Sequence, residues 1–314
     1  MRHCRSDLSS NGLFTRRFNL CRHLSLFVAL LMSVLFAVSA AAQSASPSAS
    51  PSNSPSNSAP EAPSATVAVD RLAEVLRLDE VIDIMRDEGK EYARELEIEL
   101  MPEGAGQLWQ QHIARVYNAK DMRSEVTEAL ENRLTPKDLA AITAFFDTKT
   151  GQEILRFENA ARRAMQDPAV EDIAWQQFSA LRPGTERRLA LHRFVRANDL
   201  LERNVAGALN ANAQFFRGMT RGGALAMNED EILRETWGQE QELREDTEKW
   251  LFGFLHLAYQ PLSDAVLDDY IRFSKTPEGQ ALNTALFEGF DSMYRLISYR
   301  LGLGAAIALS GSTL

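Results

Sequence analysis

Cysteine is nearly absent from this sequence. Its 314 residues include only Cys4 and Cys21. Both precede an apolar run that begins at residue 24, in a segment that we expect to be removed from the mature chain. A mature chain without thiols excludes disulfides, thiolate catalysis and cysteine-ligated metals.

Positive charge is also scarce. The formal net charge is −9, and removal of the five arginines and one aspartate ahead of residue 43 would leave 29 basic and 42 acidic residues, or −13. Nucleic acids and anionic lipids bind clustered positive charge. Neither is therefore an expected partner.

The first 67 residues have the pattern of an export signal and a linker. An arginine-containing polar segment is followed by the apolar run Leu24–Val38 and by small residues up to Ala42, typical of a cleavable signal peptide over 1–42. An uncleaved anchor is the alternative, because residues 24–42 approach the roughly 20 needed to cross a bilayer. The small-residue ending favours cleavage, a periplasmic location and no remaining membrane span. Residues 43–67, rich in Ser, Pro and Ala, are predicted to be a disordered linker.

The rest of the chain lacks strand signals and repeats one helical junction. No run of alternating β-branched residues is bounded by turn residues, so we predict an all-α fold. Residues 134–152 return as 262–280, and six of these nineteen positions are identical. The repeat predicts two tandem, related helical domains of about five helices each, over 68–182 and 184–314. A looser match of the earlier parts places an insertion in the second copy near residues 217–224.

Each copy of the junction contains two predicted helix starts. Thr135 and Ser263 occupy N-cap positions, and Pro136 follows the first of them, where its missing N–H costs nothing. Thr148 and Thr276 begin the next helix in each copy. Leucines on both sides of each first cap are spaced as a hydrophobic staple.

This string of a Ser/Thr cap, a helix ending in Phe, Thr-x-x-Gly-Gln and a second helix resembles the domain of unknown function 2059 family of exported bacterial proteins. The resemblance covers Leu134–Ile154 and again Leu262–Leu282. Two positions depart from the family pattern: Lys149 replaces a usual proline and Ser274 replaces an aromatic residue. The resemblance implies a small helical domain in the envelope, and it implies no activity and no catalytic residues.

The Gly-Gln pairs are the strongest candidates for a site. A glycine in the first helical turn exposes N–H groups that can hold an anion. In the structural interpretation, which we favour, the glycine allows two helices to approach closely and the glutamine folds back onto a free N–H. Neither pair is followed by the Lys-Ser/Thr of a phosphate loop. The four residues are Gly151, Gln152, Gly279 and Gln280.

Other polar residues give weaker signals. The histidines of the mature chain lack metal-ligand spacing, and neighbouring acids are expected on solvated helix faces. We therefore predict no catalytic, cofactor or metal residues and no cofactor. The residues considered are His112, His192, His256, the pair Asp268 and Asp269, and the pair Glu240 and Glu242.

Aromatic residues suggest a core and a possible groove. Four tryptophans and two adjacent phenylalanines are expected mostly in the core. A groove between the two copies is the alternative, with the glycine-containing segment 217–224 as its mobile lip. The apolar tail Leu301–Leu309 is predicted to be a docked helix end or an interface strip. The aromatic residues are Trp109, Trp175, Trp237, Trp250, Phe215 and Phe216.

Two functions remain open. The sequence favours a non-enzymatic periplasmic protein that binds an envelope protein or an apolar ligand. The alternative is an envelope hydrolase with an unrecognised carboxylate site. The first requires that no two acids are buried together, and the second requires a carboxyl with a raised pKa in a cleft.

Overall fold

The computed structural model describes residues 65–311, and every regular element within this range is an α-helix. The predicted all-α class is confirmed. The predicted signal peptide 1–42 lies outside the described residues, as does the predicted linker up to residue 64. Residues 65–67 already belong to the first described helix, so helical structure begins three residues earlier than predicted.

Short connections join the helices. Within residues 65–311, seven helices lie before the Pro183-Gly184 turn and six after it, which is more than the predicted five per half. They are α2 (Ala65–Val75), α3 (Leu78–Leu100), α4 (Gly106–Val116), α5 (Ala119–Arg133), α6 (Pro136–Phe146), α7 (Lys149–Ala164), α8 (Pro168–Ala180), α9 (Glu186–Asn198), α10 (Leu200–Arg221), α11 (Glu229–Trp237), α12 (Glu240–Tyr259), α13 (Asp264–Ser274) and α14 (Pro277–Leu309).

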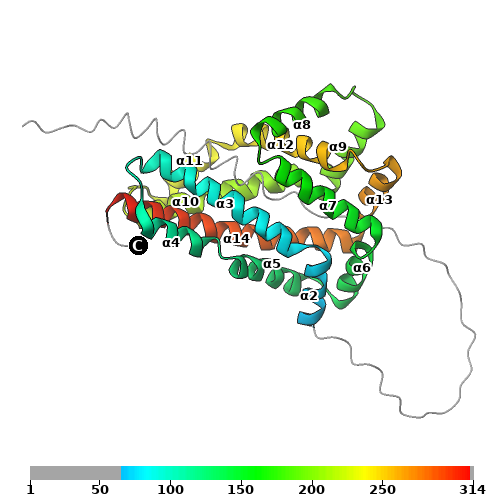
Figure 1. Cartoon of the computed structure of the whole chain (residues 1–314), viewed down its shortest axis with the longest axis horizontal. Coiled ribbons are helices and arrows are strands. Elements are labelled where there is room, and N and C mark those ends of the chain that lie inside the picture. Colours follow the sequence, from blue (N-terminus) through cyan, green and yellow to red (C-terminus); the bar gives the residue numbers. More distant parts are fainter. Residues whose placement is uncertain (1–64, 312–314) are drawn as a thin grey trace, which may run out of the picture.

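The long helices α10 and α14 pack against each other along much of their length (Figure 1). Two glycines allow the close approach. A Cβ atom added at Gly218 would lie 2.2 Å from the carbonyl oxygen of Tyr299, and one added at Gly302 would lie 2.2 Å from that of Phe215. Real Cβ atoms do not approach backbone this closely, so larger residues would force the helices apart.

The two predicted halves share one core. Helix α14 packs on α5 of the first half, while α12 packs on α7 and α8 (Figure 1). One hydrophobic cluster extends from Val69 to Ala306 and includes apolar residues of both halves. The residues before and after the Pro183-Gly184 turn therefore depend on each other for burial.

Both junctions are built as the sequence predicts. The side chain of Thr135 accepts a hydrogen bond from the Asp138 amide, which completes a capping box, and that of Ser263 accepts from the Val266 amide. The next helices start in the same way, with Thr148 and Thr276 accepting from the glycine amides three residues later. The staple leucines Leu134, Leu139, Leu262 and Leu267 are buried.

Most of the segment 217–224, where the sequence match placed an insertion, is helical. Residues 217–221 form the last turn of α10, and Gly222 lies against α14. Helix α12 has 20 residues and α5 has 15. Trp109 lies inside α4, whereas Trp237 is the last residue of α11.

The apolar tail is the C-terminal part of α14. Leu301 and Ala305 are buried, which agrees with the predicted docked helix end. Among residues 65–311, no helix is both long enough and apolar enough to cross a membrane.

Candidate functional site

The Gly-Gln pairs are packing and anchoring elements. A Cβ atom at Gly151 would lie 2.6 Å from the carbonyl oxygen of Phe145, and the Gly151 amide already donates to Thr148. The side-chain amide of Gln152 donates to the carbonyl oxygens of Val75 and Phe146, both at 2.8 Å. The structural interpretation is supported, but the predicted role of the glutamine is wrong, because it caps the C-terminal ends of α2 and α6.

The second pair has the same contacts. A Cβ atom at Gly279 would lie 2.2 Å from the carbonyl oxygen of Phe273. The side-chain amide of Gln280 donates to Ala197 at 2.9 Å and to Ser274. Each glutamine thus ties the start of one helix to the ends of two others.

The histidines are not brought together. His112 Nε2 lies 2.9 Å from the carbonyl oxygen of Arg300, whereas His192 contacts the rings of Phe178 and Phe252. His256 is buried in α12. Burial lowers the pKa of all three imidazoles. Within residues 65–311, no three His, Asp, Glu or Cys side chains are grouped as metal ligands.

The acid pairs considered from sequence are on helix surfaces. Asp268 pairs with Arg193, and Asp269 pairs with Arg272. Glu240 accepts from Arg244, and Glu242 is exposed. None of these arrangements brings two carboxyls together around a substrate-sized space.

The aromatic residues divide into core and surface. Trp109, Trp250 and the adjacent phenylalanines of α10 are buried, and Trp175 is half-buried. Trp237 is the exception to the expected core position, because 63% of its surface is exposed. The segment 217–224, considered from sequence as a mobile lip, is mostly helical.

Two buried carboxylates, one on α7 and one that pairs with α7, were missed by the sequence analysis. Glu88 of α3 accepts two hydrogen bonds from Arg162, at 2.8 and 3.0 Å, and both side chains are buried. Burial disfavours the charge of Arg162, but attraction to Glu88 outweighs it and raises the pKa of Arg162. Glu158, one turn earlier on α7, accepts from the hydroxyl groups of Tyr259 and Tyr270.

A sequence signal for these residues exists. Ile154 and Leu155 face the core, and Glu158 and Arg162 follow at spacings of three, four and eight residues, which place them on the same helix face. Burial raises the pKa of Tyr259 well above its usual value, which keeps its hydroxyl protonated and able to donate. Both carboxylates therefore have positively charged or hydroxyl partners inside the core.

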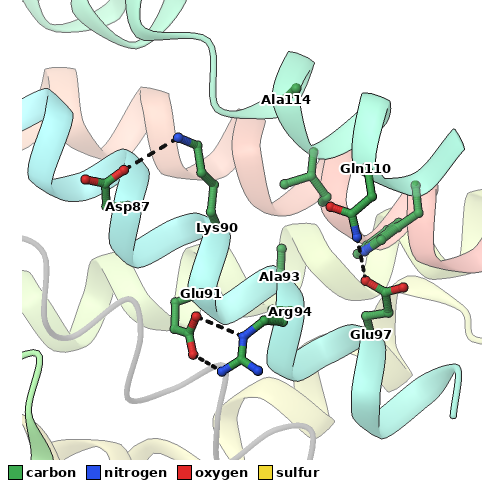
Figure 2. A pocket seen from close by; sticks show the side chains of 10 residues that line it. Asp87, Lys90, Glu91, Ala93, Arg94, Glu97, Gln110 and Ala114 are labelled. Atoms are coloured by element: carbon green, nitrogen blue, oxygen red, sulfur yellow. Dashed lines mark hydrogen bonds and ion pairs between the residues drawn. The ribbon is translucent and has the colours of Figure 1, made fainter. Parts of the chain in front are cut away.

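A surface groove of about 440 Å³ lies between α3 and α4 (Figure 2). Its deep side is apolar and includes Trp109 and Ile113, while Ala114 is at its exposed side. Charged and amide side chains of both helices line the rest. These are Asp87, Lys90, Glu91, Arg94, Glu97 and Gln110.

The polar groups of this α3–α4 groove pair with one another. Arg94 donates to Glu91 from the preceding turn, and Lys90 pairs with Asp87 at 3.5 Å. Gln110 of α4 donates to Glu97 of α3 at 2.8 Å, so this bond connects the two sides of the groove (Figure 2). Exposed pairs of this kind contribute little stability and open readily. The groove can therefore offer both charge signs to a ligand.

Two carboxyls have raised pKa values, but neither lines this groove. Burial raises the pKa of Glu171, opposed by Lys249. Burial also raises the pKa of Asp291, opposed by Arg295 and Arg203. The α3–α4 groove and the two carboxyls with raised pKa values are thus at different places.

The capped helices and their common core define an all-α protein over residues 65–311. The model of a family described as an uncharacterized protein conserved in bacteria (DUF2059) matches residues 120–176 of this chain. The match includes the first junction and not the second. No curated protein matches the chain, and no solved structure matches it.

Proposed function

We propose that this chain is a non-enzymatic periplasmic protein that binds an envelope protein through the α3–α4 groove. The main support is that the groove is open and carries both charge signs, whereas the buried carboxylates Glu88 and Glu158 are held by core partners. Sites for apolar small molecules are predominantly apolar and enclosed. The charged sides of this groove suit a polypeptide with side chains of both signs.

Site-specific photo-crosslinking in cells tests this role. A photoreactive amino acid at Ala114 should give a discrete adduct with an envelope protein, because Ala114 is exposed at the groove. The matched control is Ala141, which is exposed on α6. The Arg94→Glu substitution should remove the adduct without lowering the melting temperature. Equal labelling from both positions would reject the groove as the binding site.

The hydrolase alternative has weaker support. A catalytic carboxyl must reach its substrate, and both Glu88 and Glu158 are buried with partners. Glu171 and Asp291 have the raised pKa that the alternative requires, but they do not line the groove. The observations therefore favour binding.

The periplasmic location is part of the same proposal. It is supported by the basic, apolar and small-residue pattern of residues 1–42. We expect mature protein in the periplasmic fraction with an N-terminus near Ala41 or Gln43. Edman sequencing checks this, and an intact N-terminus in the membrane fraction would instead establish the anchor.

We also propose that the halves 68–182 and 184–314 are related copies. The matching capping, glycine and glutamine contacts of the two junctions support this. So does a second correspondence: Arg77 before α3 and Asp199 before α10 both adopt a left-handed conformation, with φ of 56° and 53°. The reciprocal packing of α14 on α5 and of α7 on α12 is a further point of support.

A further inference from the structure

One face of helix α11 packs against the rest of the protein, and another face is exposed to solvent. Ile232 packs with Ala213 and Phe216 of α10 in a small cluster that is separate from the main core. On the outer side, Leu233 and Trp237 are 39% and 63% exposed. They are four residues apart, so their side chains are neighbours on one helix face.

The comparison with α4 shows what α11 lacks. Helix α4 packs against the C-terminal part of α14, which helps to bury Trp109 to 1% exposure. His112 of α4 contacts the Trp109 ring and reaches the backbone of α14 at Arg300. Helix α11 has substantial packing with α10 alone. Figure 1 places α11 near the end of the molecule where α14 ends.

The surroundings of this face are acidic. Residues 229–248 contain nine carboxylates and two arginines. Glu229 is paired with Arg217, and Arg244 binds Glu202 and Glu240. Asp230 lies three residues before Leu233 and seven before Trp237, on the same side of α11, and Arg234 lies beside it, whereas Glu235 is two residues from each apolar side chain and on the other side of the helix. A partner would therefore meet two apolar side chains beside Asp230 and Arg234, on a segment whose net charge is negative.

We propose that the outer face of α11 docks a basic amphipathic helix of another envelope protein. An apolar side chain of that helix covers Leu233 and Trp237, and a Lys or Arg side chain faces Asp230. An exposed tryptophan also attracts cations over its ring. A second copy of this chain, or an anionic membrane, would meet like charge and is disfavoured.

This inference deepens the proposed binding role, and its test is independent of the groove. The probe is a fluorescein-labelled 18-residue helix of Leu and Lys, mixed with the full mature protein and followed by fluorescence polarisation. A peptide with Glu in place of Lys is the control. We expect binding of the basic peptide that weakens as salt is raised, and no binding of the acidic peptide.

Substitutions locate the binding face. Leu233→Ala and Trp237→Ala should each weaken binding about tenfold or more, as for central aromatic and apolar contacts. Leu189→Ala is the matched control, because Leu189 is 41% exposed on α9. Asp230→Asn should reduce the salt dependence.

Three outcomes would overturn the inference. Peptide binding that is unchanged in Leu233→Ala and Trp237→Ala would show only nonspecific attraction to an acidic protein. Binding of the protein to anionic phosphatidylglycerol vesicles through Trp237 would assign the face to a membrane. A concentration-dependent dimer lost in Trp237→Ala would assign it to a second copy. In each case, the Ala114 crosslink would still test the groove.

Discussion

Helices α7 and α14 begin with the same turn but bury different chemistry. In both, a threonine caps the glycine amide and a glutamine binds the ends of two preceding helices. Seven residues after the glycine, α7 has Glu158 and α14 has Leu286. Eleven residues after it, α7 has Arg162 and α14 has Phe290, and all four are buried.

This difference shows that the start of each helix and its later turns are constrained by different kinds of contact. The start of each helix is constrained by backbone atoms that lie within 3 Å of the position a Cβ atom of the glycine would take, and no substitution removes backbone atoms. One or two turns later, each side chain meets other side chains, and these can change together. On α7 the partners are Glu88, Tyr259 and Tyr270, which come from α3, α12 and α13. The same helix start is therefore compatible with a polar or an apolar interior.

Removing one partner of the buried ion pair should give the largest loss of stability. Glu88→Gln or Arg162→Met leaves a buried group uncompensated, and breaking such a pair typically costs about 3–5 kcal/mol. For a chain of this size, we expect the melting temperature to fall by roughly 6–20 °C. Thermal unfolding followed by circular dichroism measures the change.

The double variant Glu88→Leu with Arg162→Met makes α7 more like α14. Replacement of a whole buried pair by apolar residues is often neutral or stabilising. We expect the double variant to be more stable than either single variant. A double variant as unstable as the sum of the singles would mean that the polar interior of α7 is a requirement of the fold.

The glycines of the two junctions should give the next largest effect. Gly151→Val and Gly279→Val each place a branched side chain against backbone of the preceding helix, and overpacking costs about 1–3 kcal/mol. A loss of ~2 kcal/mol lowers the melting temperature by roughly 4–8 °C in a chain of this size. The control is Ala140→Val, at an exposed position of α6.

Phosphate distinguishes packing from ligand binding in the same melts. If the glycines serve packing alone, both variants melt earlier by the same amount with and without phosphate or sulfate. Unchanged melting, combined with loss of an anion-dependent stabilisation, would instead make the Gly-Gln turns a binding site.

The local parts of this fold could be predicted from the sequence, and the long-range parts could not. Thr135, Ser263, Thr148 and Thr276 act within four residues of themselves, so their caps are visible in the sequence. The sharing of one core depends on α14 reaching α5, which no local pattern encodes. Gln152 was misinterpreted for the same reason, because one of its acceptors, Val75, is 77 residues away.

The candidate site was predicted less well than the fold. The charged residues that line the α3–α4 groove are mostly exposed side chains, and their charges gave no distinctive spacing. Trp237 was expected in the core with the other tryptophans, since residue type alone favours burial. Its exposure depends on where α14 ends and which helix it covers, and this is a property of the assembled fold.

The smallest expected effect is a pH dependence of stability that comes from His112 of α4. Helix α11 has no histidine and should contribute none. Burial lowers the pKa of His112 in the folded protein, although its hydrogen bond to the Arg300 carbonyl opposes the shift; the charges of Arg115 and Arg300 lower it further. The unfolded chain, with an ordinary pKa of about 6.5, takes up a proton first as the pH falls. The contribution of neutral His112 to stability is therefore fully present above the unfolded pKa. It decreases as the pH falls from about 7 through the folded pKa. His112→Gln should reduce the change in melting temperature between pH 7.5 and 5.5, while His192 and His256 still contribute to that change. If the variant instead melts earlier by the same amount at every pH, the substitution has removed packing against α14 and has not removed a titrating group.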